Sequence, residues 1–431
     1  MMCGGSNGKY LSALRLCTLA LSWLVAVSGA IADDWHFGGH VKYQYTHTDY
    51  RSDDIYAVFG GDPAQDHGLD LRLKAENRSG PWDFVAHYEL LAVYGDTLDA
   101  RRSLAAAGFP FTGAASGLPD DRRRLFDLTH EITDRDRRAV VHRLDRLSVG
   151  HGGTRQTLRF GRQAVSWGNG LVFQPLDFVN PFSPIAIDKD YKTGDDMLYG
   201  QWQVGDGGDV QAIVLPRRDP ATHRVEGSQS SYAVKFHTRF ADVDLDLLAA
   251  RHFSENLAGV GVVKSVGGAI WRMDVSYTDL EPGGSATSLV TNLDYSWTWG
   301  GRNVYGYLEY FRSGVGETDR ANYAAPGAEL SARLSRGELF TLARDYATLG
   351  LQVELTPLVN LHTSLIANLN DGSKYLQLRG VYDWQQDVQF MAGLNLPAGE
   401  RGTEYGGVPV AGSPFYVSAG RAVYLRGAFY F

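Results

Sequence analysis

The feature that most constrains this chain is an alternation of apolar and polar residues that recurs along most of its length. In residues 69–76, leucine and alanine take the odd positions while charged residues take the even ones. The same period of two recurs in residues 232–240, 289–298 and 361–370. Because successive side chains of a β-strand point to opposite faces of a sheet, this period predicts many two-faced strands.

Strand length and strand ends favour a membrane barrel over a soluble β-sandwich, which also alternates. The predicted strands have about 9 to 14 residues, as a tilted membrane crossing requires. Aromatic residues gather near strand ends, as at Tyr295, Trp297 and Trp299. The last strand ends at Phe431. It must pair with the first strand, since an open edge in lipid leaves unpaired backbone groups.

We therefore predict an all-β fold, a closed antiparallel transmembrane β-barrel of about 18 strands (about 16–18). The predicted strands are residues 37–49, 67–78, 82–95, 142–151, 155–163, 196–205, 208–216, 230–241, 242–253, 257–266, 268–281, 286–299, 301–313, 338–356, 358–370, 373–384, 386–397 and 415–431. The long connections are about 96–141, 164–195, 313–337 and 397–414. We interpret the first, with its charged runs, as a solvated extracellular loop rather than a binding patch.

Residues 1–32 have the pattern of a cleaved secretory signal peptide. Lys9 and Arg15 form a basic start, residues 16–27 are apolar, and Ala30 and Ala32 supply the small residues before cleavage. An uncleaved membrane anchor is disfavoured because the apolar run is shorter than the roughly 20 residues that span a bilayer. The remaining residues, 33–431, are predicted to form one barrel domain.

Composition narrows the function classes. Cys3 and Cys17 leave with the signal, so the mature chain carries no disulfide, thiol nucleophile or cysteine zinc site. Losing the two basic signal residues changes the formal net charge from −8 to −10, which argues against nucleic acid as a partner. The mean hydropathy of −0.23 argues against membrane-spanning helices, whereas in a barrel only every second strand residue faces lipid.

One stretch carries a motif: Gly-Arg-Gln at 161–163, Trp-Gly-Asn-Gly at 167–170, and an Asp-x-x-Asn-Pro run at 177–181. This pattern resembles one in a poorly characterised family of proteobacterial outer-membrane β-barrels that are distantly similar to alginate-export and porin-like barrels. The resemblance covers about 35 residues and otherwise extends only to architecture. It implies an outer-membrane barrel with a transport role and names no substrate.

The connection at 164–195 is unusually apolar for a loop in water and contains several prolines, so it is not a strand throughout. We predict that it folds into the lumen and narrows the pore, because irregular backbone at membrane depth survives only inside the barrel. The alternatives are packing on the rim or covering a neighbouring subunit. The predicted constriction residues are Trp167, placed near the membrane interface, with Asp177, Asn180, Asp188 and Asp190.

Strand parity places charges of both signs in the lumen, where charge sets ion preference. The predicted pore-lining or substrate-contacting cations are Arg155, Arg159, Lys235, Arg239, Arg379 and Arg426. The same parity places further charged residues inside: Lys42, Arg72, Lys74, Arg146, Arg272, Asp70, Glu76, Glu89, Asp244, Asp246, Asp274, Asp294 and Glu354. The cations at 155, 159, 235 and 239 are either a cationic ladder or members of a paired network that stiffens the wall.

No catalytic or metal motif stands out. The Asp-Lys-Asp sequence at 188–190, followed by Gly194, matches a calcium loop poorly. His36, His40 and His47 have spacings that do not suit a metal site on one strand. We therefore predict no enzyme activity, no cofactor and no metal.

The sequence as a whole predicts an outer-membrane porin or channel for small polar or anionic solutes. The alternative is an export or assembly barrel that hands a polymer or lipid from a periplasmic partner. The predicted partners are outer-membrane lipid and the barrel-assembly machinery, because the final strand ending at Phe431 resembles the signal that this machinery recognises. The sequence leaves the oligomeric state open.

Overall fold

The computed structural model describes residues 35–106, 117–187 and 190–431. The predicted signal peptide and the predicted constriction residue Asp188 lie outside these ranges.

Most of the described chain is β-strand. The elements are β1 (Trp35–Asp49), α2 (Ile55–Gly60), β2 (Ala64–Ser79), β3 (Trp82–Gly95), α3 (Asp96–Ala106), β4 (Thr129–Arg135), β5 (Arg138–Gly152), β6 (Gln156–Gln163), β7 (Asp195–Val204), β8 (Gly208–Leu215), β9 (Ser231–Phe240), β10 (Val243–His252), β11 (Glu255–Val266), β12 (Ala269–Asp279), β13 (Ser285–Trp299), β14 (Arg302–Arg312), η1 (Arg320–Asn322), α4 (Ala328–Arg336), β15 (Asp345–Thr356), β16 (Val359–Asn368), β17 (Lys374–Gln385), β18 (Val388–Ala398), β19 (Val408–Pro409), β20 (Tyr416–Val417) and β21 (Arg421–Tyr430).

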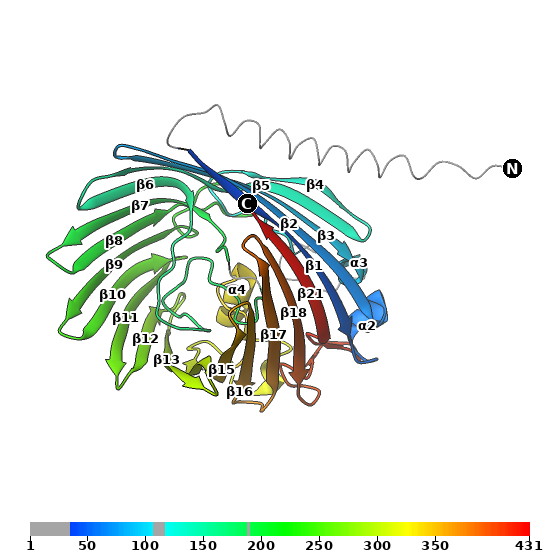
Figure 1. Cartoon of the computed structure of the whole chain (residues 1–431). Coiled ribbons are helices and arrows are strands. Elements are labelled where there is room, and N and C mark those ends of the chain that lie inside the picture. The colour runs from blue at the N-terminus through cyan, green and yellow to red at the C-terminus, as the bar shows by residue number, and fades with distance from the viewer. Residues whose placement is uncertain (1–34, 107–116, 188–189) are drawn as a thin grey trace.

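The wall is a closed antiparallel barrel of 18 strands. Each strand pairs with its neighbour in the chain, and β21 closes the ring against β1 over the register from His40–Tyr430 to Asp49–Arg421. Figure 1 shows the red last strand beside the blue first strand. The predicted fold class is therefore confirmed, and closure leaves the wall without an unpaired edge in lipid.

Strand β4 stands apart from the 18 strands of the wall. It pairs with the first part of β5, from Arg138 to Arg143, whereas β6 pairs with the last part, from Leu147 to Gly152. The hairpin of β4 and β5 thus supplies the wall beyond the end of β6, so β6 can end early. This arrangement lets the chain after Gln163 leave the wall.

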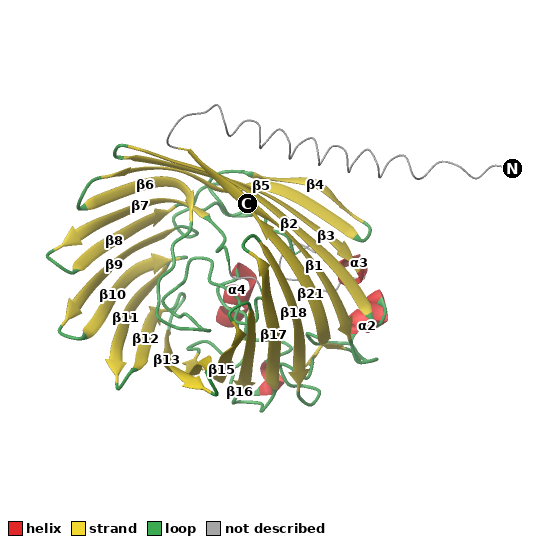
Figure 2. Ribbon diagram, in the orientation of Figure 1, coloured by secondary structure: helices red, strands yellow, loops and turns green. Residues whose placement is uncertain are grey.

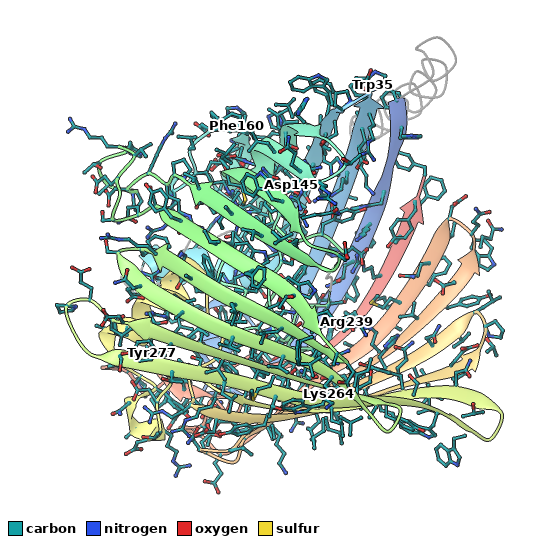
Figure 3. The ribbon with its side chains drawn as sticks, turned by 90° about the vertical axis from the view of Figure 1, so that its left-hand side faces the viewer. Trp35, Asp145, Phe160, Arg239, Lys264 and Tyr277 are labelled. Atoms are coloured by element: carbon teal, nitrogen blue, oxygen red, sulfur yellow. The ribbon has the colours of Figure 1, made fainter. Side chains whose placement is uncertain are left out.

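The two faces of the strands differ as the alternation predicts. Phe160 and Tyr277, both labelled in Figure 3, are exposed on the outer surface, whereas Asp145 is fully buried. Exposed aromatic residues gather near the short turns: Trp35, Trp82, Trp202, Phe240, Trp299 and Trp384. An apolar outer belt bordered by aromatic residues suits lipid, as in a transmembrane β-barrel. Within the described ranges, no helix has the length and apolar character needed to cross a bilayer.

The predicted strand bounds agree with the structure except at the long connections. β15 begins at Asp345 rather than at 338, because residues 342–344 pair with the preceding loop through Glu317. β21 begins at Arg421 rather than at 415, because β20 forms a separate two-stranded sheet with β19. Local alternation does not distinguish a wall strand from an extended segment that pairs over the barrel mouth.

Candidate functional site

The described residues between β6 and β7, 164–187 and 190–194, lie inside the barrel, where they appear as a coil within the ring of strands (Figures 1 and 2). We call them the lumenal segment. The preceding Gly161 has a φ of 122°, and a Cβ there would lie 2.2 Å from the Leu147 carbonyl oxygen. Only glycine fits such a close backbone approach with that conformation. The first residue of the Gly-Arg-Gln motif therefore allows β6 to approach β5 closely just before the chain turns into the lumen.

Three wall strands hold the first half of this segment by hydrogen bonds. The Glu309 carboxylate of β14 accepts the backbone N–H groups of residues 171–173, over distances of 2.6–3.1 Å. Asp274 of β12 accepts both the backbone N–H and the side-chain amide of Asn169, at 2.6 and 2.8 Å. Asn292 of β13 bridges the Asn169 carbonyl and Glu309. These contacts satisfy backbone groups that no sheet pairs.

Apolar packing holds the same segment from the other side. One buried cluster joins the segment to β7–β10 and contains Val165, Trp167, Leu176, Phe178, Val179, Met197, Ile213, Leu215, Ala233 and Leu248. A second joins it to β13–β17 through Phe173, which stacks on Phe311 at 4.4 Å between ring centroids. The apolar residues that made this segment unusual for a loop are thus covered by an apolar patch of the lumenal wall.

An ion pair between Asp177 and Lys192 links the two halves of the segment. Both side chains are nearly fully buried, and the Lys192 ammonium also donates to the Val165 carbonyl at 2.6 Å. Burial raises the pKa of the Asp177 carboxyl to about 6, although the charge of Lys192 opposes the rise. Burial likewise lowers the pKa of Lys192, against the effect of Asp177. The pair fixes where the segment returns toward the wall.

The far end of the segment rests on the seam between β1, β2 and β21. Asp190 accepts a hydrogen bond from Lys42 at 2.6 Å and one from Tyr430 at 3.1 Å. The ring of Tyr191 lies under the Arg72 guanidinium at 4.3 Å. The segment therefore spans the lumen from β6 to the closing seam.

Arg162 of the Gly-Arg-Gln motif is a structural anchor. Its side chain is almost fully buried and donates to Asp196 at 2.8 Å, to Asp121 at 3.0 Å and to the Phe126 carbonyl at 2.8 Å. Arg162 thereby links the end of β6, the start of β7 and the chain before β4. A guanidinium suits this position because it presents several donors in a fixed plane.

A cavity borders the other side of the lumenal segment. Its volume is about 430 Å³, and it lies between the segment and strands β14–β18 and β21. On the wall side its polar lining includes Tyr305, Tyr307, His362, Gln377, Arg379, Tyr424 and Arg426. On the segment side it is lined by Leu171, Val172, Pro184, Ala186, Ile187 and Asp190. We call this cavity the passage.

Two of the predicted basic residues, Arg379 and Arg426, line the passage together with the predicted constriction residue Asp190. The Arg379 guanidinium donates to the Ile187 carbonyl at 3.3 Å and so touches the lumenal segment directly. Arg426 is 7% exposed and lies on the closing strand β21.

The other four predicted cations do not meet at the passage. Arg155 lies exposed in the turn before β6, so its predicted place in the lumenal wall is corrected: the strand begins only at Gln156. Lys235 pairs with Asp246 at 3.3 Å and Arg159 with Asp83 at 3.0 Å. These side chains match the paired network rather than a cationic ladder, since β7 and β8 separate β6 from β9.

Arg239 lies near the short-turn end of the barrel, where Figure 3 labels it close to Lys264. Its side chain is 63% exposed and pairs with Asp244 at 3.7 Å. At this exposure the pair is well screened by solvent.

The remaining predicted constriction residues that the structure describes all belong to the lumenal segment. Trp167 is 4% exposed and donates its indole N–H to Gln211 at 2.8 Å, so its predicted place at the membrane interface is wrong. The apolar cluster that joins the segment to β7–β10 covers its ring, and Gln211 of β8 supplies the hydrogen-bond acceptor. Asp177 is held by Lys192, and Asn180 has a φ of 50° and donates to the Thr193 carbonyl.

The histidines near the start of the chain are dispersed. His40 is fully buried and shares a hydrogen bond of 3.0 Å with Asp70, whereas His47 lies 3.5 Å from Asp49. Within the part of the chain that the structure describes, no three His, Cys, Asp or Glu side chains are grouped to hold a metal ion.

Glu309 is the functional residue that sequence reasoning missed. The alternation of residues 301–313 places an acid on the lumenal face between the aromatic residues Tyr307 and Phe311, and this was the available signal. The backbone groups that it binds belong to a segment more than 130 residues away. No local pattern predicts that pairing.

We expect Glu309→Ala to loosen the lumenal segment. Three backbone N–H groups would lose their acceptor, so the segment would move and the current through single channels would flicker between levels. Planar-bilayer recordings measure this directly. Glu354→Ala on β15 is the matched control, because that carboxylate accepts from the Asn303 side chain near the short turns. Equal noise in both variants would contradict the tethering role of Glu309.

Comparison with known proteins supports the fold. No family model matches the sequence, and no curated protein sequence matches it. The barrel is similar to OccAB4 of Acinetobacter baumannii, with TM-score 0.52 and 9% identity over 93% of this chain and 99% of that chain. It is similar to a BenF-like porin of Pseudomonas fluorescens, with TM-score 0.51 and 10% identity over 92% and 98% of the two chains.

A third similar structure is Wzi of Escherichia coli, an outer-membrane protein involved in capsule assembly and described as a carbohydrate-binding barrel. Its TM-score is 0.52, with 10% identity over 96% of this chain and 88% of that chain. At such identities the likeness concerns the barrel fold. The similarity to alginate-export barrels that the motif suggests stays a prediction.

Proposed function

We propose that this barrel is an outer-membrane channel for the passive passage of small polar solutes, with a preference for anions. The observation that carries the proposal is the passage, which is lined by Arg379 and Arg426. The lumenal segment narrows the barrel to this one side. Fixed charges along a narrow pore determine which ions enter it.

The charge balance of the passage favours anions. Among the described residues that line it, the one carboxylate is Asp190, which is paired with the buried ammonium of Lys42 at 2.6 Å. The Arg379 Nε atom is buried and lacks a hydrogen-bond partner among the described residues, although the Nη1 atom donates to the segment. Tyr305, Tyr307, Tyr424 and Gln377 add neutral polar groups on the same wall. Among the described lining residues, the arginines thus outnumber the carboxylates.

The experiment is a reversal potential across a planar bilayer with a KCl gradient. We expect the wild-type channel to pass chloride in preference to potassium, and Arg379→Gln together with Arg426→Gln to remove or invert that preference. Arg155→Gln serves as the control, since Arg155 is exposed in a short turn. An unchanged reversal potential in the double variant would show that these arginines do not set selectivity.

The second candidate is an export or assembly barrel that works with a periplasmic partner. The observation that favours it is the extent of the lumenal segment, which reaches from β6 to the seam at Lys42 and Tyr430. A barrel that needs a partner to displace this segment would be closed when alone. Stable single-channel currents from the purified protein would support the channel, whereas silent but folded barrels would support the partner-dependent function.

A further inference from the structure

A second cavity lies at the mouth of the barrel formed by the long connections, above the lumenal segment. Its volume is about 490 Å³, and its lining comes from the chain before β4, from the β8–β9 and β14–β15 connections and from the lumenal segment. The residues around it are Asp120, Arg122, Arg123, Arg124, Phe178, Asn180, Asp195, Arg217, Pro220, Phe253, Ser335, Arg336 and Glu338. We call it the mouth cavity.

Three arginines from separate connections converge in the mouth cavity on one aromatic ring. The guanidinium carbons of Arg336, Arg217 and Arg123 lie 4.4, 5.0 and 6.0 Å from the centroid of the Phe253 ring. Like charges repel, so such a grouping needs a compensating attraction. The π-faces of the ring supply part of it.

The backbone of Phe253 supports the view that this grouping is specifically held. Phe253 and Ser254 form the tight turn between β10 and β11, with φ values of 47° and 72°. Asn and Gly are the residues that favour such turns, whereas a bulky aromatic residue in the left-handed region is unusual. The backbone strain of this conformation persists only where the surroundings hold the residue in place. Here the Phe253 ring lies among the three arginines.

The arginines of the mouth cavity differ in their partners. Arg217 pairs with Asp195 at 2.9 Å, and Arg336 forms a two-point pair with Glu338 at 2.6 and 3.1 Å. Arg123 donates instead to the neutral side-chain carbonyl of Gln229 at 2.8 Å. Among the described residues no carboxylate forms an ion pair with Arg123, so donor groups of this guanidinium remain available to the cavity.

The charge of the mouth cavity favours an anionic ligand. Its lining holds five arginines and three carboxylates. Arg124 is also paired with Asp121, which lies behind the lining, so one positive charge remains among the described residues once the ion pairs are counted. Burial, and then the charges of Arg336 and Arg217, lower the pKa of Arg123. Burial raises the pKa of Glu338, but the opposing charges of His252 and Arg336 prevail and hold it at about 2. Glu338 is therefore already engaged, and the surplus positive charge lies near Arg123.

We propose that Arg123, Arg217 and Arg336 form a binding site at the extracellular mouth for a phosphate- or sulfate-type oxyanion carried by a small solute. Guanidinium groups bind such oxyanions through several parallel hydrogen bonds. The aromatic side chains of Phe253 and Phe178 provide an apolar surface for the rest of the solute. That the bound solute then enters the passage rests on the proposed channel function. The binding site itself does not depend on that function.

A solute fits this site better than the phosphate of a membrane lipid. Phe178 and Asn180 belong to the segment inside the barrel and line the mouth cavity, so the cavity opens over the lumen. A lipid headgroup would approach from the outer surface of the wall. The test below separates these two sources of the same oxyanion chemistry.

The experiment is a calorimetric titration of the full-length mature protein in detergent with inorganic phosphate, at constant ionic strength and with sodium chloride as the blank. We expect Arg123→Gln to weaken phosphate binding by about tenfold, because the variant loses one or two charge-assisted hydrogen bonds to the phosphate. Arg123→Lys, which keeps the charge but not the planar donors, should lose less. Arg224→Gln, an exposed arginine in the β8–β9 connection, should bind as the wild type does.

Two results would overturn the proposal. One is wild-type binding of phosphate no stronger than that of chloride. The other is equal binding by Arg123→Gln and Arg224→Gln. Purified lipopolysaccharide titrated in the same detergent forms the second arm, and its binding without that of inorganic phosphate would assign the oxyanion to a lipid and reject the solute. Because the titration needs no conduction, a silent channel that still binds phosphate would refute the channel function alone.

Discussion

Replacing residues 171–187 by a short glycine–serine linker should raise the single-channel conductance by about threefold or more, because a barrel of this strand number holds a wide lumen when nothing fills it. Both ends of the replaced stretch contact the wall: Phe173 stacks on Phe311 of β14, and the Ile187 carbonyl accepts from Arg379 of β17. Removing it joins the passage to the space that the segment occupied. Planar-bilayer recording of the refolded protein measures the change.

The control for this deletion is a linker that replaces residues 221–228, an exposed stretch of the β8–β9 connection at the rim. Its conductance should stay close to that of the wild type. An unchanged conductance after loss of the lumenal segment would show that the segment is not the constriction. Silence of both the wild type and the deletion, in barrels that still shift on a gel when heated, would refute the diffusion channel.

Arg162→Ala should destabilise the barrel by about 3–5 kcal/mol, since it leaves buried carboxylates without their cation. Asp196 and Asp121 are both within 3.0 Å of this guanidinium, and all three side chains are almost fully buried. Burial by itself raises the pKa of Asp121, but Arg124 and Arg162 outweigh it and the pKa is lowered. Urea titration of the protein in lipid vesicles measures the free energy of unfolding.

Arg159→Ala on the same strand is the matched control. Its side chain is 35% exposed and forms one ion pair, with Asp83. The expected cost is at most about 1 kcal/mol, as is usual for pairs that solvent screens. Arg162→Lys should also lose stability, because an ammonium group cannot reproduce the planar set of donors. Equal unfolding free energies for the two alanine variants would show that Arg162 is not an anchor.

The barrel wall was predictable because its information is local. Alternation over 8 to 16 residues fixes which face of each strand meets lipid, as at residues 69–76. Closure follows from the cost of an unpaired edge in lipid, and Phe431 ends the chain beside β1. The hairpin β4 was missed since its alternation is short and both its faces are largely exposed.

The inward course of residues 164–194 was predictable in outline, because apolar side chains without regular pairing need cover somewhere. Its destination was not. Glu309 binds backbone groups at 171–173, and Asp190 reaches Lys42, across separations of more than 130 residues. Such contacts depend on which wall strands face one another across the lumen, a property of the closed barrel as a whole.

The sequence by itself determined the strands, their faces and the membrane environment, since each depends on neighbours in the chain. The tertiary structure alone decided how charge is distributed inside. It paired Lys235 with Asp246 and Arg159 with Asp83, brought Arg379 and Arg426 to one passage, and gathered Arg123, Arg217 and Arg336 around Phe253. Parity predicts that a charged side chain points inward, but only the three-dimensional positions determine whether an opposite charge is there to meet it.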